Sequence, residues 1–143
     1  LEVKAIDNDK ETFYIDDSIE FALTFTVKGN ETVKLDWIFS VSAVNGVGAF
    51  SDSPLYRKEP LQGREFMPGV RYRVTCRIPA FFFNYGYFYL NVFCVDGIRA
   101  VFEELKVLLF EMRQPVWEVG RVYGSKAFSL LRPALDWNIA EIK

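Results

Sequence analysis

Hydrophobic and polar residues alternate along most of the chain with a period of two. In residues 18–29 the apolar positions share one parity; they are Ile19, Phe21, Leu23, Phe25 and Val27. Residues 33–46 repeat the pattern with Leu35, Trp37, Phe39 and Val41, and residues 70–79 with Val70, Tyr72, Val74, Cys76 and Ile78. Successive side chains of a strand point to opposite faces, so this alternation predicts strands with one buried and one solvated face.

A fourth run, residues 101–112, predicts a strand with Leu105, Val107 and Leu109 pointing inward. Turns with Gly or Pro separate the runs, and no stretch keeps a helical period over three turns. The polar segment from Phe50 to Met67 predicts a long connection with one short edge strand. At 143 residues the chain is expected to form a single all-β domain, an antiparallel β-sandwich over residues 1–143.

The C-terminal part departs from this rhythm. Residues 113–134 predict a connection, and residues 135–142 resume the alternation, with Leu135, Trp137 and Ile139 on one side. A last strand so far from the body can pair within its own sheet. It can equally pair with a neighbour's sheet, which is strand exchange between protomers.

Residues 81–97, FFFNYGYFYLNVFCVDG, are unusually rich in Phe and Tyr. Residues 81–84 are expected to form the loop that leads into a strand. Period two then places Phe88, Leu90, Val92 and Cys94 on a uniformly apolar face. The opposite face carries rings, hydroxyls and an amide, from Tyr87, Tyr89, Asn91 and Phe93. We expect the first set to lie in the hydrophobic core and the second set to face solvent or a partner.

The outer face of this strand suits carbohydrate, because rings stack on the apolar faces of sugars while hydroxyl and amide groups bind their edges. If strands 35–42 and 101–112 share the sheet, they add polar groups and a cation for an acidic sugar or phosphate. The predicted carbohydrate-binding residues are Tyr87, Tyr89, Asn91, Asp36, Ser40 and Lys106. The alternative is that the tyrosines reflect β-propensity alone.

Several kinds of chemistry are excluded by composition. The chain has no histidine, which removes Ser-His-Asp and Cys-His catalysis and every His-containing zinc site. Adjacent carboxylates such as Glu103 and Glu104 point to opposite faces of a strand, and Asp16-Asp17 is better suited to a turn. A net charge of −2 provides no footprint for nucleic acid. We expect a domain that is not an enzyme and carries no cofactor or metal.

Two further features allow two interpretations each. Cys76 and Cys94 predict either free thiols in a reducing compartment or a disulfide between the sheets. Arg71, Arg73 and Arg77, the arginine row, predict either a solvated strand face or a binding surface for an anionic glycan.

The order of the motifs carries a resemblance. A polar turn and amphipathic strand, FYIDDSIEFALTFTV, are followed by a strand, a Gly turn and a small polar segment, LDWIFSVSAVNGVGAFSDS. Then come a strand, a Pro turn and a Gly-Tyr strand, GVRYRVTCRIPAFFFNYGYFYLNVFCVDG. The acidic strand VFEELKVLLFEM precedes GRVYGSKAFSLLRPALDW, which ends in Trp. In this order they resemble the C-terminal carbohydrate-binding domain of the ATP-binding subunit of bacterial O-antigen polysaccharide ABC transporters, the Wzt type.

This resemblance implies an immunoglobulin-like β-sandwich that binds the non-reducing end of an O-polysaccharide glycan. It also implies a homodimer, a parent ATPase domain, a transporter membrane subunit and a cytoplasmic location at the inner membrane. The start at Leu1 agrees with a piece of a longer protein. Two other functions fit the same residues: an immunoglobulin-like protein-interaction domain, and an accessory domain of a glycan-processing enzyme.

Overall fold

The computed structural model describes residues 2–7, 12–53 and 65–115. Within these ranges every regular element is a strand: β1 (Glu2–Asp7), β2 (Thr12–Tyr14), β3 (Ile19–Thr26), β4 (Val33–Lys34), β5 (Asp36–Ala43), β6 (Gly48–Asp52), β7 (Glu65–Phe66), β8 (Arg71–Ile78), β9 (Gly86–Asp96) and β10 (Arg99–Arg113). The same ranges hold no helix that could cross a membrane. The predicted terminal strand 135–142, and the predicted connection from residue 116 onward, lie outside the described residues.

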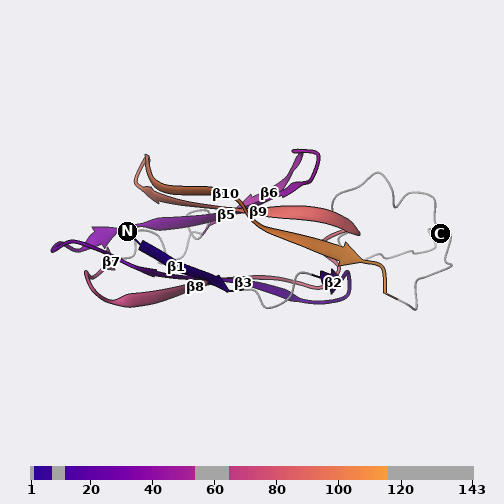
Figure 1. Ribbon diagram of the computed structural model, residues 1–143, viewed down its shortest axis with the longest axis horizontal. Helices are drawn as coiled ribbons and strands as arrows, with labels where there is room; N and C mark the ends of the chain where they lie inside the picture. Colours follow the sequence, from indigo (N-terminus) through magenta and orange to yellow (C-terminus); the bar gives the residue numbers. More distant parts are fainter. Residues whose placement is uncertain (1, 8–11, 54–64, 116–143) are drawn as a thin grey trace, which may run out of the picture.

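The strands form two facing layers (Figure 1). One layer is a five-stranded sheet in the order β2-β10-β9-β5-β6, and the other is a three-stranded sheet in the order β1-β3-β8. The short strands β4 and β7 form a separate pair. Strand pairs are antiparallel except β2 and β10, which run parallel over three residue pairs. The predicted all-β antiparallel sandwich is confirmed.

The alternation of residues correctly predicted which side chains enter the space between the layers. The five apolar residues predicted inward on β3 and just after it are all buried, and so are the four predicted on and before β5. On β9 the predicted core set is buried as well. The inward residues of β8 are less enclosed: Ile78 is buried, Val70 is exposed, and Tyr72, Val74 and Cys76 lie between. This agrees with the place of β8 at an edge of its sheet.

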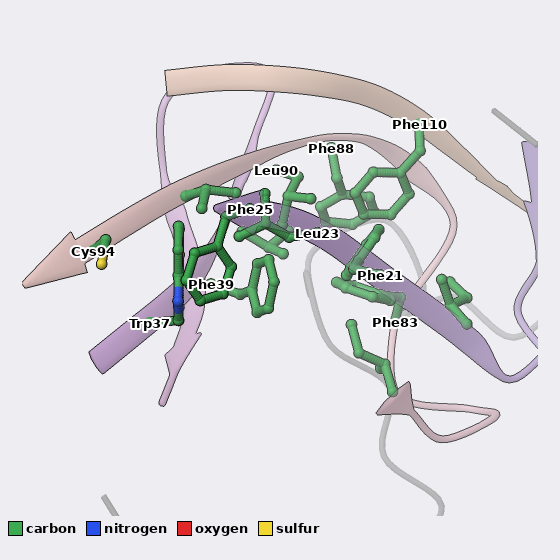
Figure 2. Packing of buried hydrophobic residues seen from close by; sticks show 14 of the residues in the cluster. Phe21, Leu23, Phe25, Trp37, Phe39, Phe83, Phe88, Leu90, Cys94 and Phe110 are labelled. Carbon is green, nitrogen blue, oxygen red and sulfur yellow. The ribbon is translucent and has the colours of Figure 1, made fainter. Parts of the chain in front are cut away.

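Aromatic rings from both layers meet in the core (Figure 2). The Phe88 and Phe110 rings stack with centroids 5.6 Å apart, and Phe21 approaches Phe110 from the other sheet at 5.4 Å. Phe83 lies 4.9 Å from Phe88 and is fully buried, although it belongs to the predicted loop before β9. Burying such a ring stabilises a fold by about 1.5–3 kcal/mol. The loop therefore supplies core as well as a connection.

The prediction for β10 assigned the wrong set of alternate residues to the core. Leu105 and Leu109 are exposed at 57% and 46%, whereas Phe110 and Met112 are buried; Val107 alone of the predicted set packs against the core. The register explains the difference. Glu104 pairs with Val92 and Leu108 pairs with Leu90, so residues 105–107 form a bulge opposite a single β9 residue. On both sides of the bulge, even-numbered residues of β10 oppose the core set of β9: Phe102 pairs with Cys94, and Phe110 with Phe88. The bulge adds two residues, an even number, so it leaves this parity unchanged, and the odd-numbered leucines face outward.

Turns and cysteines follow the simpler expectations. Before β3, the Asp17 carboxylate accepts a hydrogen bond of 2.8 Å from the backbone N–H of Tyr14, which gives this aspartate the predicted turn role. Gly97 turns the β9–β10 hairpin with a φ of 61°, a left-handed conformation that glycine adopts without strain. Cys76 and Cys94 form no disulfide. The reducing compartment stays a prediction.

Candidate functional site: the tyrosine face

The outer side of the five-stranded sheet gathers most of the predicted binding residues. Its central strand, β9, pairs with β5 on one side and β10 on the other. In register, Ser40 lies opposite Asn91, and Ser42 and Leu109 both lie opposite Tyr89. We call this surface the tyrosine face; it comprises Tyr87, Tyr89, Asn91 and Phe93 of β9, Ile38, Ser40 and Ser42 of β5, and Lys106 and Leu109 of β10.

The two tyrosines differ in their surroundings. Tyr87 is 55% exposed and lies opposite Glu111, whose carboxylate forms an ion pair of 2.8 Å with Arg113. Tyr89 is half-buried between its neighbours on β5 and β10. Opposed side chains on neighbouring strands lie about 4.5–5.5 Å apart at their Cβ atoms, so both rings have close polar neighbours. A ring in such a setting can stack on a flat apolar ligand surface while its hydroxyl stays wet.

Asn91 is buried, at 8% exposure, and its amide is used within the sheet. Its Oδ1 accepts a hydrogen bond of 2.8 Å from the backbone N–H of Lys106. Its Nδ2 donates to the carbonyl oxygen of Ser40 at 3.3 Å and lies 3.4 Å from the Ser42 hydroxyl oxygen. The structure thus places Asn91 on the predicted face, but gives its amide internal partners rather than leaving it open to a ligand.

Lys106 lies in the bulge of β10. Its side chain is exposed, and the ammonium nitrogen stands 5.1 Å from the centroid of the Tyr89 ring. That distance is within the range of a cation–π interaction. The sequence had placed this lysine on the same sheet as the tyrosines, and the bulge brings its charge beside one of them.

Asp36 is the predicted site residue that the structure does not bring to the centre of the face. It begins β5 opposite Val95 and is buried. At about 3.3 Å per residue it lies roughly 13 Å along the strand from Ser40. Burial, followed by the charge of Asp36, raises the pKa of the neighbouring Cys94 thiol to about 12. Asp36 shares the outward parity of Ile38 and Ser40, but its burial leaves little of its carboxylate open to a ligand.

Leu105 and Leu109 are apolar residues of this region that the sequence analysis had assigned to the core. Leu109 lies directly opposite Tyr89, and Leu105 belongs to the bulge. Apolar residues occupy both parities from residue 107 to 109, so period two alone does not reveal the phase. Exposed Leu109 widens the apolar part of the tyrosine face.

A concavity of about 390 Å³ opens between β6 and β8. Phe50, Phe82 and Arg77 are among its lining residues. The Arg77 guanidinium is already paired with Glu20 at 3.2 Å, and the two phenylalanine rings contact each other edge to face at 5.2 Å. Among residues in the described ranges, no group of three or more His, Cys, Asp or Glu could hold a metal ion.

Comparison with known proteins adds one informative likeness. No protein-family model matches the chain, and no curated protein does. A solved structure titled "Crystal structure of the C-terminal domain of wzt" matches with a TM-score of 0.68 and 7% identity, covering 93% of this chain and 75% of that one. A second is titled "X-ray structure of Northeast Structural Genomics Consortium target SoR45" and has 16% identity, covering 80% of this chain and 83% of that one. Its TM-score of 0.33 is too low to indicate a shared fold. The chain therefore has the β-sandwich fold of the C-terminal domain of Wzt, as its sequence resemblance implied.

Proposed function

We propose that this chain is a noncatalytic carbohydrate-binding module that recognises the non-reducing end of an O-antigen polysaccharide for export by an ABC transporter. The observation that carries the proposal is the tyrosine face itself: an exposed ring and a half-buried ring in line on one strand, flanked by serines and a lysine. The fold shared with the Wzt domain supports the transporter context.

Each group on the face has a chemical role in this proposal. Tyr87 and Tyr89 stack on the apolar side of a sugar ring, and the Ser40 hydroxyl binds at its edge. Lys106 meets a negative substituent on the glycan, because its ammonium makes no ion pair with any residue of the described ranges. A few such contacts on an open face predict a Kd between about 1 mM and 1 μM.

The wider setting follows from the same proposal. The domain would sit in the cytoplasm beside the inner membrane, joined to a parent ATPase domain and through it to the transporter's membrane subunit. It would act as a homodimer and need no cofactor. Weak binding by one domain suits this arrangement, since two linked sites raise avidity through effective concentration.

The test is a titration of the protein with purified O-polysaccharide from its own organism, capped and uncapped, by calorimetry. The double variant Tyr87→Ala with Tyr89→Ala is expected to weaken binding at least about tenfold, or ~1.4 kcal/mol. Its melting temperature should change little, because the outer face is not core. The matched control is Arg71→Ala with Arg73→Ala, which has the same spacing on the outer face of β8.

The control is expected to bind as the unmodified protein does. Loss of binding in the arginine variant alone would move the site to the arginine row and overturn the proposal. A tyrosine variant that unfolds readily yet binds normally would show that these rings are structural.

The exposed leucines support a second candidate, an immunoglobulin-like protein-interaction domain. Leu105, Leu109 and Tyr87 expose apolar surface of the kind that protein interfaces bury. A glycan panel without signal, together with a stable complex with another protein that Leu109→Asp abolishes, would favour this function over glycan binding.

A further inference from the structure

The bulge of β10 is placed opposite Asn91. Between the pairs Glu104–Val92 and Leu108–Leu90, β10 has three residues (105, 106 and 107) and β9 has one (91). β10 therefore carries two extra residues at this point, and their backbone groups cannot all take part in the regular ladder. Whatever satisfies them decides the shape of the bulge.

The side chain of Asn91 accepts a hydrogen bond from one of these backbone groups, the N–H of Lys106. The backbone N–H of Lys106 donates to Oδ1 of Asn91 at 2.8 Å. On the other side the amide nitrogen of Asn91 donates to the carbonyl oxygen of Ser40 at 3.3 Å, with the Ser42 hydroxyl oxygen 3.4 Å away. One amide thus links β5, β9 and β10 across the centre of the tyrosine face. Its burial shields these bonds from competing water.

The bulge gives Lys106 an unusual backbone. Its φ is 55°, in the left-handed region, which a lysine occupies only when its surroundings hold it there. In this conformation its ammonium stands 5.1 Å from the Tyr89 ring centroid. The ammonium forms no ion pair with any residue in the described part of the chain. A strained residue that holds its ammonium beside a ring, with no carboxylate partner among the described residues, is a feature that binding of an anion would use.

We propose that Asn91 is a positioning residue: by holding the bulge, it places the Lys106 ammonium beside Tyr89 and makes the tyrosine face prefer saccharides that carry a carboxylate or phosphate group. The inference rests on the proposed glycan-binding function and deepens it by naming the residue that positions the cation. Asn91 makes its contribution through Lys106 and does not need to touch the sugar.

The experiment uses NMR on the full 143-residue chain. Glucose, glucuronic acid and glucose 6-phosphate are titrated separately into the unmodified protein, Asn91→Ala, Lys106→Gln and the double variant. The matched control is Thr75→Ala, an outer-face residue on β8 opposite Ala22. Amide hydrogen exchange at Lys106 is measured in each variant without sugar, because it reports the hydrogen bond to Asn91 directly.

The unmodified protein is expected to bind the two anionic sugars at least about fivefold more tightly than glucose. Asn91→Ala and Lys106→Gln should each lose this preference while still binding glucose, and the double variant should lose no more than either single one. Exchange at the Lys106 amide should speed up at least about tenfold in Asn91→Ala. Thr75→Ala should change neither measurement. The two anionic sugars distinguish a carboxylate site from a phosphate site.

Each contrary result has its own meaning. If Asn91→Ala weakens all three sugars equally, or adds its effect to that of Lys106→Gln, then Asn91 is merely structural and the inference is wrong while glycan binding stands. Unchanged exchange at the Lys106 amide in Asn91→Ala overturns the inference whatever the sugars do. If no sugar and no O-polysaccharide binds, the proposed function fails with its ligand preference, and the exchange rate still decides whether Asn91 holds the bulge.

Discussion

The outer faces of the two sheets share one periodicity and differ in almost everything else. On β8 the outward residues are Arg71, Arg73, Thr75 and Arg77, all exposed. Arg77 reaches across to Glu20 on β3, and both side chains stay largely in water, at 75% and 43% exposure. On the tyrosine face the outward residues are rings, hydroxyls and one buried amide that links three strands.

The difference follows from the position of each strand. β8 is an edge strand of the described three-stranded sheet, whereas β9 has a partner on both sides. Long charged side chains on an edge strand discourage pairing with other chains, which favours the solvated interpretation of the arginine row. A central strand needs no such protection. Its side chains are held by neighbours on two sides, and such preorganisation reduces the entropic cost of binding a ligand.

The largest expected effect tests whether the tyrosine face is truly an outer face. Phe110→Ala should lower the free energy of unfolding by about 3–5 kcal/mol, because it removes a buried ring. The adjacent Leu109→Ala should cost less than about 1 kcal/mol, because that side chain is largely in solvent. Urea denaturation measures both. Equal costs would place Leu109 under a cover and remove it from the proposed binding surface.

The effect of intermediate size concerns the inner side of each sheet, where one cysteine lies: Cys94 in the five-stranded sheet and Cys76 in the three-stranded sheet. Burial raises the pKa of the Cys94 thiol to about 12, and an unfolded thiol ionises near pH 8.5. Between these values the unfolded chain has lost a proton that the folded chain keeps. Stability is therefore unaffected below pH 8 and should fall above pH 9 by up to about 1.4 kcal/mol per pH unit.

Urea denaturation from pH 7 to pH 10 measures this slope, and Cys94→Ala should reduce it. Cys76→Ala is the matched control, because it removes a cysteine but leaves the Cys94 thiol in place on the inner side of the five-stranded sheet. If the slope of Cys94→Ala equals that of the unmodified protein, the Cys94 thiol is not enclosed as described.

The smallest expected effect concerns the arginine row. A double-mutant cycle with Glu20→Gln and Arg77→Gln should give a coupling below about 1 kcal/mol, because both partners are exposed. The coupling should shrink further in 0.5 M salt. A larger, salt-resistant coupling would mean that this face is as firmly held as the tyrosine face, and the contrast between them would disappear.

The sequence predicted which residues share the tyrosine face, but not how they are hydrogen-bonded to one another. Tyr87, Tyr89, Asn91, Ser40 and Lys106 were expected on one surface, and the register places them there. Whether that surface binds sugar stays a prediction. The use of the Asn91 amide inside the sheet was not foreseeable, because it depends on a bulge whose length no local pattern reveals. Asp36 had the right parity but lies buried at the end of its strand.

Alternation by itself determined the large apolar side chains of β3, β5 and β9 that form the core, because the direction of a strand side chain is a local property with a fixed period of two. It did not predict the burial of Ala22 and Thr24 on the other side of β3. Only the tertiary structure decided the phase of β10, the entry of the loop residue Phe83 into the core, and the position of Lys106 beside Tyr89. These features arise from pairing between distant segments. The number of β10 residues that lie opposite Asn91 depends on how β9 and β10 pair, so it cannot be read from the sequence of either strand alone.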